Sequence, residues 1–165
     1  MPCAHTVLPV RGAALQEDLT FQSIEQEVAS LPGCYSAPSG CILLASWQPP
    51  DQASSADIGC VAIRPLPGEA QGGSGEPGGG AAGRRVCEMK RLWVQEAHQR
   101  SGLGRQLVQA AVAAARDMGY QAVVLDTLER LTGANRVYES LGFARRDAYY
   151  HNPLPNVVYW QLDLL

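Results

Sequence analysis

The chain has little lysine, few aromatic residues and none of the cysteine patterns that mark crosslinked or metal-bound folds. Lys90 is the single lysine among 13 basic residues, and the net charge is −3. Five scattered cysteines without a C-x-x-C pair argue against a disulfide framework and a zinc site. No apolar run approaches the roughly 18 residues of a membrane span, and the N-terminus lacks a signal-peptide pattern. These absences predict a cytoplasmic protein with no metal, no membrane partner and no nucleic-acid partner.

The apolar content is sufficient for one folded unit. With 165 residues and 46% hydrophobic residues, the chain is expected to form a single domain over residues 1–165, with its core in 17–165. Residues 68–83 hold eight of the 17 glycines, which predicts a flexible loop. Too little chain precedes this loop for it to be a domain boundary. The glycine-rich loop is interpreted either as a disordered surface insertion or as a lid over a functional site.

Hydrophobic periodicity divides the chain into helices and strands of an α/β (α+β) fold. Helical spacing with terminal glycine or proline predicts helices over 17–31, 102–118 and 132–141. Short apolar runs between turn residues predict strands over 41–46, 58–64, 86–94, 122–128 and 157–162. Residues 48–55 are then a hairpin loop, and the glycine-rich loop joins two neighbouring antiparallel strands. The strand–helix–strand order of the second half predicts a crossover onto a common sheet.

The stretch 99–105 predicts a phosphate site. It reads Gln-Arg-Ser-Gly-Leu-Gly-Arg and lies between a predicted strand and an alanine-rich helix. The first N–H groups of a helix have no internal partner, and the helix dipole adds positive potential there. Glycine allows the backbone to approach a phosphate closely, and arginine supplies forked donors. The stretch does not extend to G-x-G-x-x-G, because position 107 is leucine.

Four motifs in order carry a family resemblance: residues 87–94, 99–104, 125–127 and 134–143. Together they resemble the GNAT superfamily of acyl-CoA-dependent N-acetyltransferases. The resemblance implies a central mixed, mostly antiparallel sheet flanked by helices, in which a splayed strand pair holds acetyl-CoA. It also implies acetyl transfer to an amine. Residues 149–153 resemble a bacterial-type subgroup of unsettled substrate. Only sixteen residues precede the helix predicted from residue 17, so we expect an N-terminus that is shortened relative to the family. A short strand over residues 5–10 is the expected remnant.

The resemblance assigns cofactor contacts to three segments. The pantetheine arm is expected to pair with the backbone of Leu92, Trp93 and Val94, where a free N–H near Val94 would stabilise the oxyanion. Asn135 is a candidate hydrogen-bond partner of the cofactor, or a residue that satisfies local backbone groups. The pyrophosphate is expected on Gln99, Arg100, Ser101, Gly102, Leu103, Gly104 and Arg105.

Two side chains are candidates for proton transfer. Glu88 would remove a proton from the attacking amine, directly or through water, because an amine with a pKa near 10 is protonated at neutral pH. The alternative is a salt bridge with Arg91 or another arginine. Regular alternation along the strand predicts Glu88, Lys90 and Leu92 on one face. Tyr138 would protonate the departing thiolate, and its alternative is packing of a helix on the sheet.

The sequence does not distinguish one acceptor from another. A small-molecule amine and a protein amine both stay open as the acceptor, and the oligomeric state, including a homodimer, stays open as well. Tyr149, Tyr150 and Asn152 are candidates to line the acceptor pocket, whereas His98 and His151 are expected at the surface. A covalent acyl group on Cys87 is not expected. Two alternatives to an enzyme stay open: a non-catalytic acyl-CoA-binding module and an unrelated nucleotide-binding domain.

Overall fold

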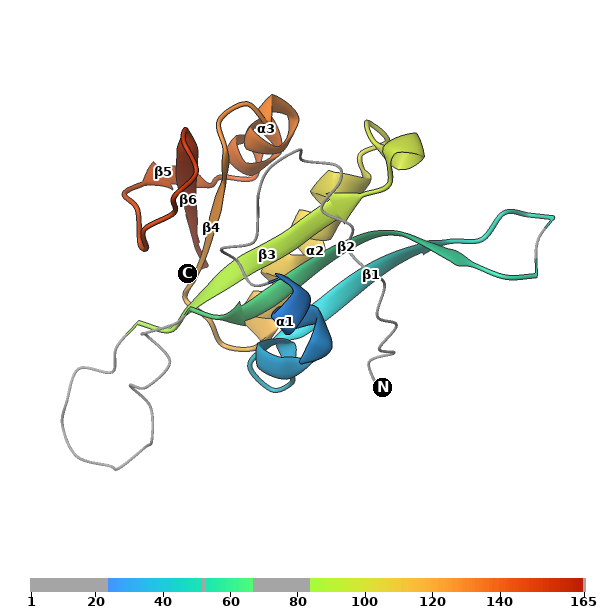
Figure 1. The fold of residues 1–165 in the computed structure, drawn as a ribbon, viewed down its shortest axis with the longest axis horizontal. Helices are drawn as coiled ribbons and strands as arrows, with labels where there is room; N and C mark the ends of the chain where they lie inside the picture. Colours follow the sequence, from blue (N-terminus) through green and yellow to red (C-terminus); the bar gives the residue numbers. More distant parts are fainter. Residues whose placement is uncertain (1–23, 52, 67–83, 165) are drawn as a thin grey trace.

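A computed structural model describes residues 24–51, 53–66 and 84–164, and its strands form one six-stranded sheet (Figure 1). The strand order is β1-β2-β3-β4-β6-β5, and only the β3–β4 pair is parallel. None of the described helices is long and apolar enough to cross a membrane. The elements in chain order are α1 (Ile24–Ala29), β1 (Cys41–Trp47), β2 (Ala56–Pro65), β3 (Val86–Val94), α2 (Leu103–Asp117), β4 (Ala122–Leu128), α3 (Thr132–Ser140), β5 (Ala144–Arg146) and β6 (Val157–Asp163), with 3-10 turns at Gly33–Tyr35 and Glu96–His98.

The periodicity predicted nearly all of these elements. The mixed, mostly antiparallel sheet flanked by helices is confirmed, as are the hairpin between β1 and β2 and the antiparallel pairing of β2 with β3. Of the helix predicted over 17–31, the described part is helical from 24 to 29. The three-residue strand β5 was not predicted, because so short an edge strand carries no period. The predicted strand in residues 5–10, residues 17–23 and the loop 68–83 lie outside the described residues.

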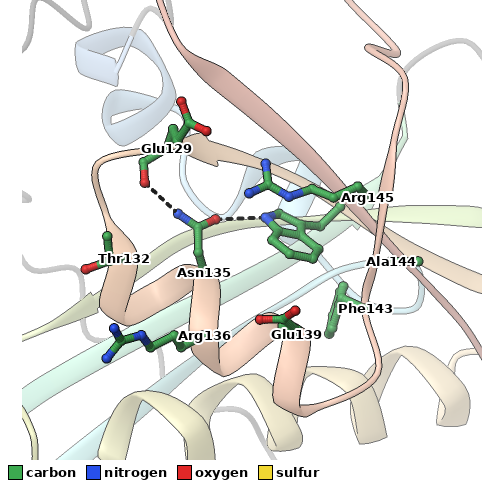
Figure 2. Close-up of a pocket in the computed structure, with 9 residues that line it drawn as sticks. Glu129, Thr132, Asn135, Arg136, Glu139, Phe143, Ala144 and Arg145 are labelled. Carbon is green, nitrogen blue, oxygen red and sulfur yellow. Dashed lines mark hydrogen bonds between the residues drawn. The ribbon is translucent and has the colours of Figure 1, made fainter.

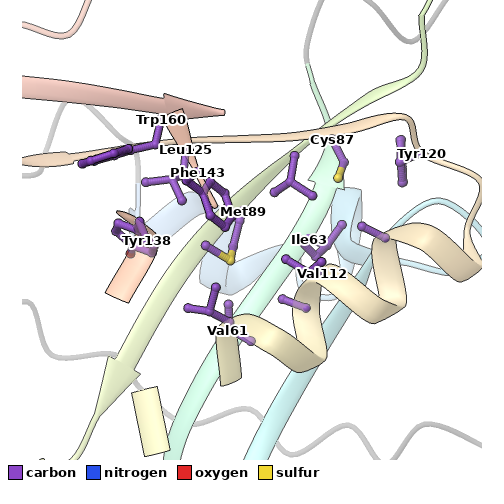
Figure 3. Packing of buried hydrophobic residues seen from close by; sticks show 14 of the residues in the cluster. Val61, Ile63, Cys87, Met89, Val112, Tyr120, Leu125, Tyr138, Phe143 and Trp160 are labelled. Carbon is purple, nitrogen blue, oxygen red and sulfur yellow. The ribbon is translucent and has the colours of Figure 1, made fainter. Parts of the chain in front are cut away.

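The main core lies between α2 and the face formed by β1, β2 and β3 (Figures 1 and 3). From the helix, Ala111 and Ala115 are fully buried, and their small side chains allow close approach to the sheet. Val61, Ile63 and Met89 meet them from the strands. The helix ends as predicted, because the residue after its last turn, Gly119, adopts a φ of +76°.

The β3–β4 pair separates after three residues. Backbone pairing runs from Val86 opposite Ala122 to Glu88 opposite Val124 and then stops. Both strands continue beyond this point, with β3 paired only to β2 and β4 only to β6. In Figure 1, β4 turns away from β3 toward α3. The splayed strand pair predicted from the family resemblance is therefore present, and it leaves one edge of β3 open from Met89 onward.

A β-bulge interrupts β3 just beyond the separation. Cys60 lies opposite Trp93 and Ala62 lies opposite Lys90, so two residues of β3 share a single partner on β2. Arg91 takes a φ of 59° at this bulge. The bulge turns Arg91 to the same face as Glu88, where it binds α1, and lets Leu92 pack against the core. The predicted alternation is therefore confirmed for Glu88 and Lys90, which face the same polar cluster, but wrong for Leu92, because the extra residue shifts the period.

Candidate functional site

The loop 99–105 passes from the end of β3 to the first turn of α2. Gly102 is the residue before the helix and has a φ of 89°, and a Cβ built there would meet nothing within 4 Å. Ser101 donates to the His98 carbonyl at 2.6 Å and accepts from the Leu103 N–H at 3.4 Å. A left-handed glycine in open space at a helix N-terminus is what close approach of an anion requires.

This loop is joined to the open edge of β3 and to α3. Gln99 donates through Nε2 to the Val94 carbonyl at 3.2 Å, which fixes the loop to the last residue of the strand. Arg105 reaches in the other direction and donates to the Ser140 hydroxyl at 2.6 Å. The exposed guanidinium of Arg105 thus lies at the junction of α2 and α3. The structure brings the predicted pyrophosphate loop and the predicted pantetheine strand into one continuous path.

Glu88 is the most deeply buried charged group of the site. Its side chain is 2% exposed, and the residue occupies the last position of β3 that pairs with β4. Arg64 binds Oε2 through two nitrogens at 2.7 and 2.8 Å, and Tyr149 donates its hydroxyl to Oε1 at 2.8 Å. The Lys90 ammonium lies 3.6 Å from the same Oε1. The predicted salt bridge of Glu88 with an arginine is therefore present, but the arginine is Arg64 and not Arg91.

Helix α1 is attached to this cluster by a second carboxylate. Glu27 accepts two hydrogen bonds from Arg91, at 2.7 and 3.0 Å, and lies 4.0 Å from Arg64. Burial acts to raise the pKa of Glu27, but the bonds from Arg91 outweigh it and hold that pKa below its ordinary value of 4.5. A chain of alternating charges thus runs from α1 to Glu88.

Asp126 forms the second half of the polar cluster, on β4. Lys90 binds Oδ1 at 3.0 Å, while the Tyr150 hydroxyl and the Asn152 amide bind Oδ2 at 2.8 and 3.0 Å. The sequence interpretation gave Asp126 and Lys90 no role. The sequence contains a signal for each residue. Asp126 lies inside the motif 125–127, and Lys90 follows Glu88 by two residues on the same predicted strand.

The tyrosines of the segment after β5 close over the two carboxylates. Tyr149 and Tyr150 contact Glu88 and Asp126, and each lies against the ring of Tyr159 at 5.4 and 6.0 Å. Burial raises the pKa of both hydroxyls, and the neighbouring carboxylates raise it further. Both therefore stay protonated and act as hydrogen-bond donors. Among the described residues no group of His, Cys, Asp and Glu is arranged to hold a metal ion.

Tyr138 lies on α3 and belongs to the main core. Its side chain is 4% exposed, with ring contacts to Phe143 at 5.7 Å and Trp160 at 6.4 Å (Figure 3). Burial raises its pKa, and the charge of Asp126 adds to the effect. The hydroxyl is therefore protonated at neutral pH, as a general acid must be. The ring contacts equally fulfil the packing alternative.

Asn135 lies one turn earlier on α3 and lines a cavity of about 450 Å³ between α3 and β5 (Figure 2). Its Nδ2 is within 3.2 Å of the carbonyls of Leu128, Glu129 and Leu131. Its Oδ1 accepts from Trp160 Nε1 at 2.9 Å. Because these contacts use both ends of the amide, the geometry favours the local-backbone alternative over a cofactor contact.

Comparisons with known proteins show the family to which the chain is similar. The family model described as the acetyltransferase (GNAT) family matches residues 22–143. An uncharacterised N-acetyltransferase of Schizosaccharomyces pombe is 40% identical over 147 residues, which cover 89% of this chain and 78% of that protein. A second uncharacterised N-acetyltransferase, from Dictyostelium discoideum, is 41% identical but matches only 48% of this chain and 38% of its own length.

Solved structures share the fold at low sequence identity. A GNAT-family acetyltransferase from Elizabethkingia anophelis, crystallised with acetyl-CoA bound, has a TM-score of 0.59 at 20% identity and covers 97% of this chain and 95% of its own. A protein of Desulfovibrio desulfuricans has a TM-score of 0.64 at 18% identity, with 97% and 96% covered. At these identities the likeness concerns the fold alone.

Proposed function

Since the chain belongs to the acetyltransferase (GNAT) family, we propose that it transfers an acetyl group from acetyl-CoA to a primary amine by direct attack in a ternary complex. The main support for this proposal is the gap that opens where β3 and β4 separate, after Glu88 and Val124. Different features lie on its two sides. On one side lies the glycine loop at the start of α2, and on the other lie two buried carboxylates. A thioester threaded through the gap would face an amine held at the carboxylates.

The cofactor is proposed to bind along the path that joins the loop to β3. The first turn of α2, with Arg100 and Arg105, would hold the pyrophosphate by backbone donors, helix dipole and charge. The pantetheine amides would pair with the open edge of β3 along Leu92–Val94, as an added strand does. A backbone N–H near Val94 would then donate to the thioester oxygen as negative charge develops.

Proton transfer is assigned to the two candidates from the sequence. Glu88 would accept the amine proton through the hydroxyl of Tyr149, to which it is already bonded at 2.8 Å. This path keeps Tyr149 protonated, because it receives one proton as it passes one on. Tyr138 would protonate the thiolate, although a thiol with a pKa around 8.5 departs well without help. Positioning of the two substrates supplies most of the rate, because the thioester is already activated.

A free-thiol assay with acetyl-CoA and a panel of small amines and peptides tests the proposal. Glu88→Gln is expected to lower kcat about 10²-fold or more, the scale of a general base, and Tyr138→Phe to lower it less. Tyr120→Phe is the matched control, since this buried tyrosine donates to the Ser39 carbonyl at the far end of α2. Turnover of the best amine by Tyr138→Phe equal to that of Tyr120→Phe would contradict the acid role.

Thermal protection by acetyl-CoA, measured beside the free-thiol assay, separates an enzyme from a binding module. Protection by acetyl-CoA without turnover of any amine would support the non-catalytic acyl-CoA-binding module. The family match excludes the other alternative, an unrelated nucleotide-binding domain. Cytoplasmic location, a homodimer and the choice between small-molecule and protein amines stay predictions.

A further inference from the structure

The polar cluster contains an amine of its own. Lys90 is the chain's single lysine, and its side chain is only 9% exposed. Its Nζ lies 3.0 Å from Asp126 Oδ1 and 3.6 Å from Glu88 Oε1, and 5.8 Å from the centre of the Tyr150 ring. Carboxylates can bind an ammonium group and accept its proton, and here two of them enclose an amine of the protein itself.

The strand register places this amine at the gap. Glu88 and Val124 form the last backbone pair, and Lys90 and Asp126 each stand two residues further along the diverging strands. Their ion pair therefore spans the gap where it begins. Leu92, the first residue of the edge proposed to pair with the pantetheine arm, follows Lys90 by two residues on β3. The Lys90 amine therefore lies in the gap, next to the proposed path of the cofactor arm.

We propose that Lys90 is a self-acetylation site, at which the protein transfers an acetyl group from acetyl-CoA to its own Nζ. This inference rests on the proposed function of the same gap. In the step, the Lys90 ammonium passes one proton to the Asp126 carboxylate, and the freed electron pair attacks the thioester carbon. The new C–N bond forms as the C–S bond breaks. A second proton moves from nitrogen to the CoA sulfur, which leaves as the thiol.

Acetylation would change the site that performs it. The acetyl group removes the positive charge that both Glu88 and Asp126 contact. Two buried carboxylates would then share the cluster without the cation between them. The modified protein is therefore expected to turn over external amines more slowly than the unmodified one.

The experiment compares Lys90 with a lysine placed in the open. Arg116→Lys adds an exposed lysine in the last turn of α2, about 20 Å along the helix from the glycine loop. The full-length variant is incubated with isotope-labelled acetyl-CoA, and acetyl groups at both lysines are measured by peptide mapping. Self-acetylation predicts at least about tenfold more label on the buried Lys90 than on the introduced lysine, a small part of what positioned reactants gain.

Chemical acetylation predicts the reverse order, because a buried and ion-paired amine reacts more slowly than an exposed one. The same sample unfolded in urea should label both lysines equally, which shows that the preference belongs to the fold. Turnover of an added amine is followed in parallel. Turnover with Lys90 labelled less than the introduced lysine would overturn self-acetylation and leave the proposed function intact. Absence of both turnover and labelling at Lys90 would overturn both.

Discussion

Replacing Asn135 by leucine separates a structural role from a cofactor role. The leucine keeps the number and branching of the side-chain heavy atoms but removes both ends of the amide. Trp160 Nε1 then loses its only described acceptor inside the protein, at a cost of about 1–3 kcal/mol for a buried donor. The carbonyls of Leu128 and Leu131 each keep a backbone N–H at 3.0 Å, and that of Glu129 belongs to an exposed residue.

The expected loss is therefore about 1–3 kcal/mol of unfolding free energy, or about 2–12 °C in Tm for a domain of this size. Urea unfolding of Asn135→Leu, of Trp160→Phe and of the double variant measures the coupling of the pair. Because Trp160→Phe removes the donor, the double variant should be about 1–2 kcal/mol more stable than the summed losses predict.

Calorimetric titration with acetyl-CoA completes the test at a temperature where both proteins are folded. The structural role predicts an affinity close to that of the unchanged chain. The structural role would be contradicted by the opposite pattern. In that case Asn135→Leu would lose less than about 0.5 kcal/mol of stability, while its affinity for acetyl-CoA would fall about tenfold. That result would assign the amide to the cofactor, as the family resemblance implies.

Two further predictions concern stability. Gly40→Ala should unfold the chain or cost several kcal/mol, because its Cβ would lie 2.6 Å from the Cys34 carbonyl oxygen; Gly133→Ala, whose Cβ meets nothing within 4 Å, should gain about 0.5–1 kcal/mol by thermal unfolding. Glu27→Gln should cost stability at pH 7, and the difference from the unchanged chain should shrink as pH falls below about 4.5. The sign follows from the lowered pKa of Glu27, whose bond to Arg91 contributes above that pH and is lost on protonation. A difference that is constant from pH 7 to pH 3 would contradict this assignment.

Local features of the sequence were sufficient for nearly all of the elements and for the place of the loop that is predicted to bind pyrophosphate. The helices and strands follow from periods that neighbouring residues set, and the glycines at 102 and 119 occur where the backbone needs positive φ. The predicted pyrophosphate loop therefore stands at the start of α2, joined to the end of β3 through Gln99. No long-range contact is needed to infer this part of the site.

The environment of the Glu88 and Asp126 carboxylates depends on tertiary contacts. The hydrogen-bond donors to Glu88 are Arg64 on β2 and Tyr149 after β5. They are 24 and 61 residues away along the chain. The bulge that turns Arg91 toward Glu27 depends on the pairing of β3 with β2, and the meeting of Lys90 with Asp126 depends on the divergence of two strands. Such contacts join residues far apart in the chain, and no local period records them. Neighbouring residues therefore determined the position of the loop proposed to bind the cofactor, and the packing of the sheet determined which charged groups surround Glu88 and Asp126.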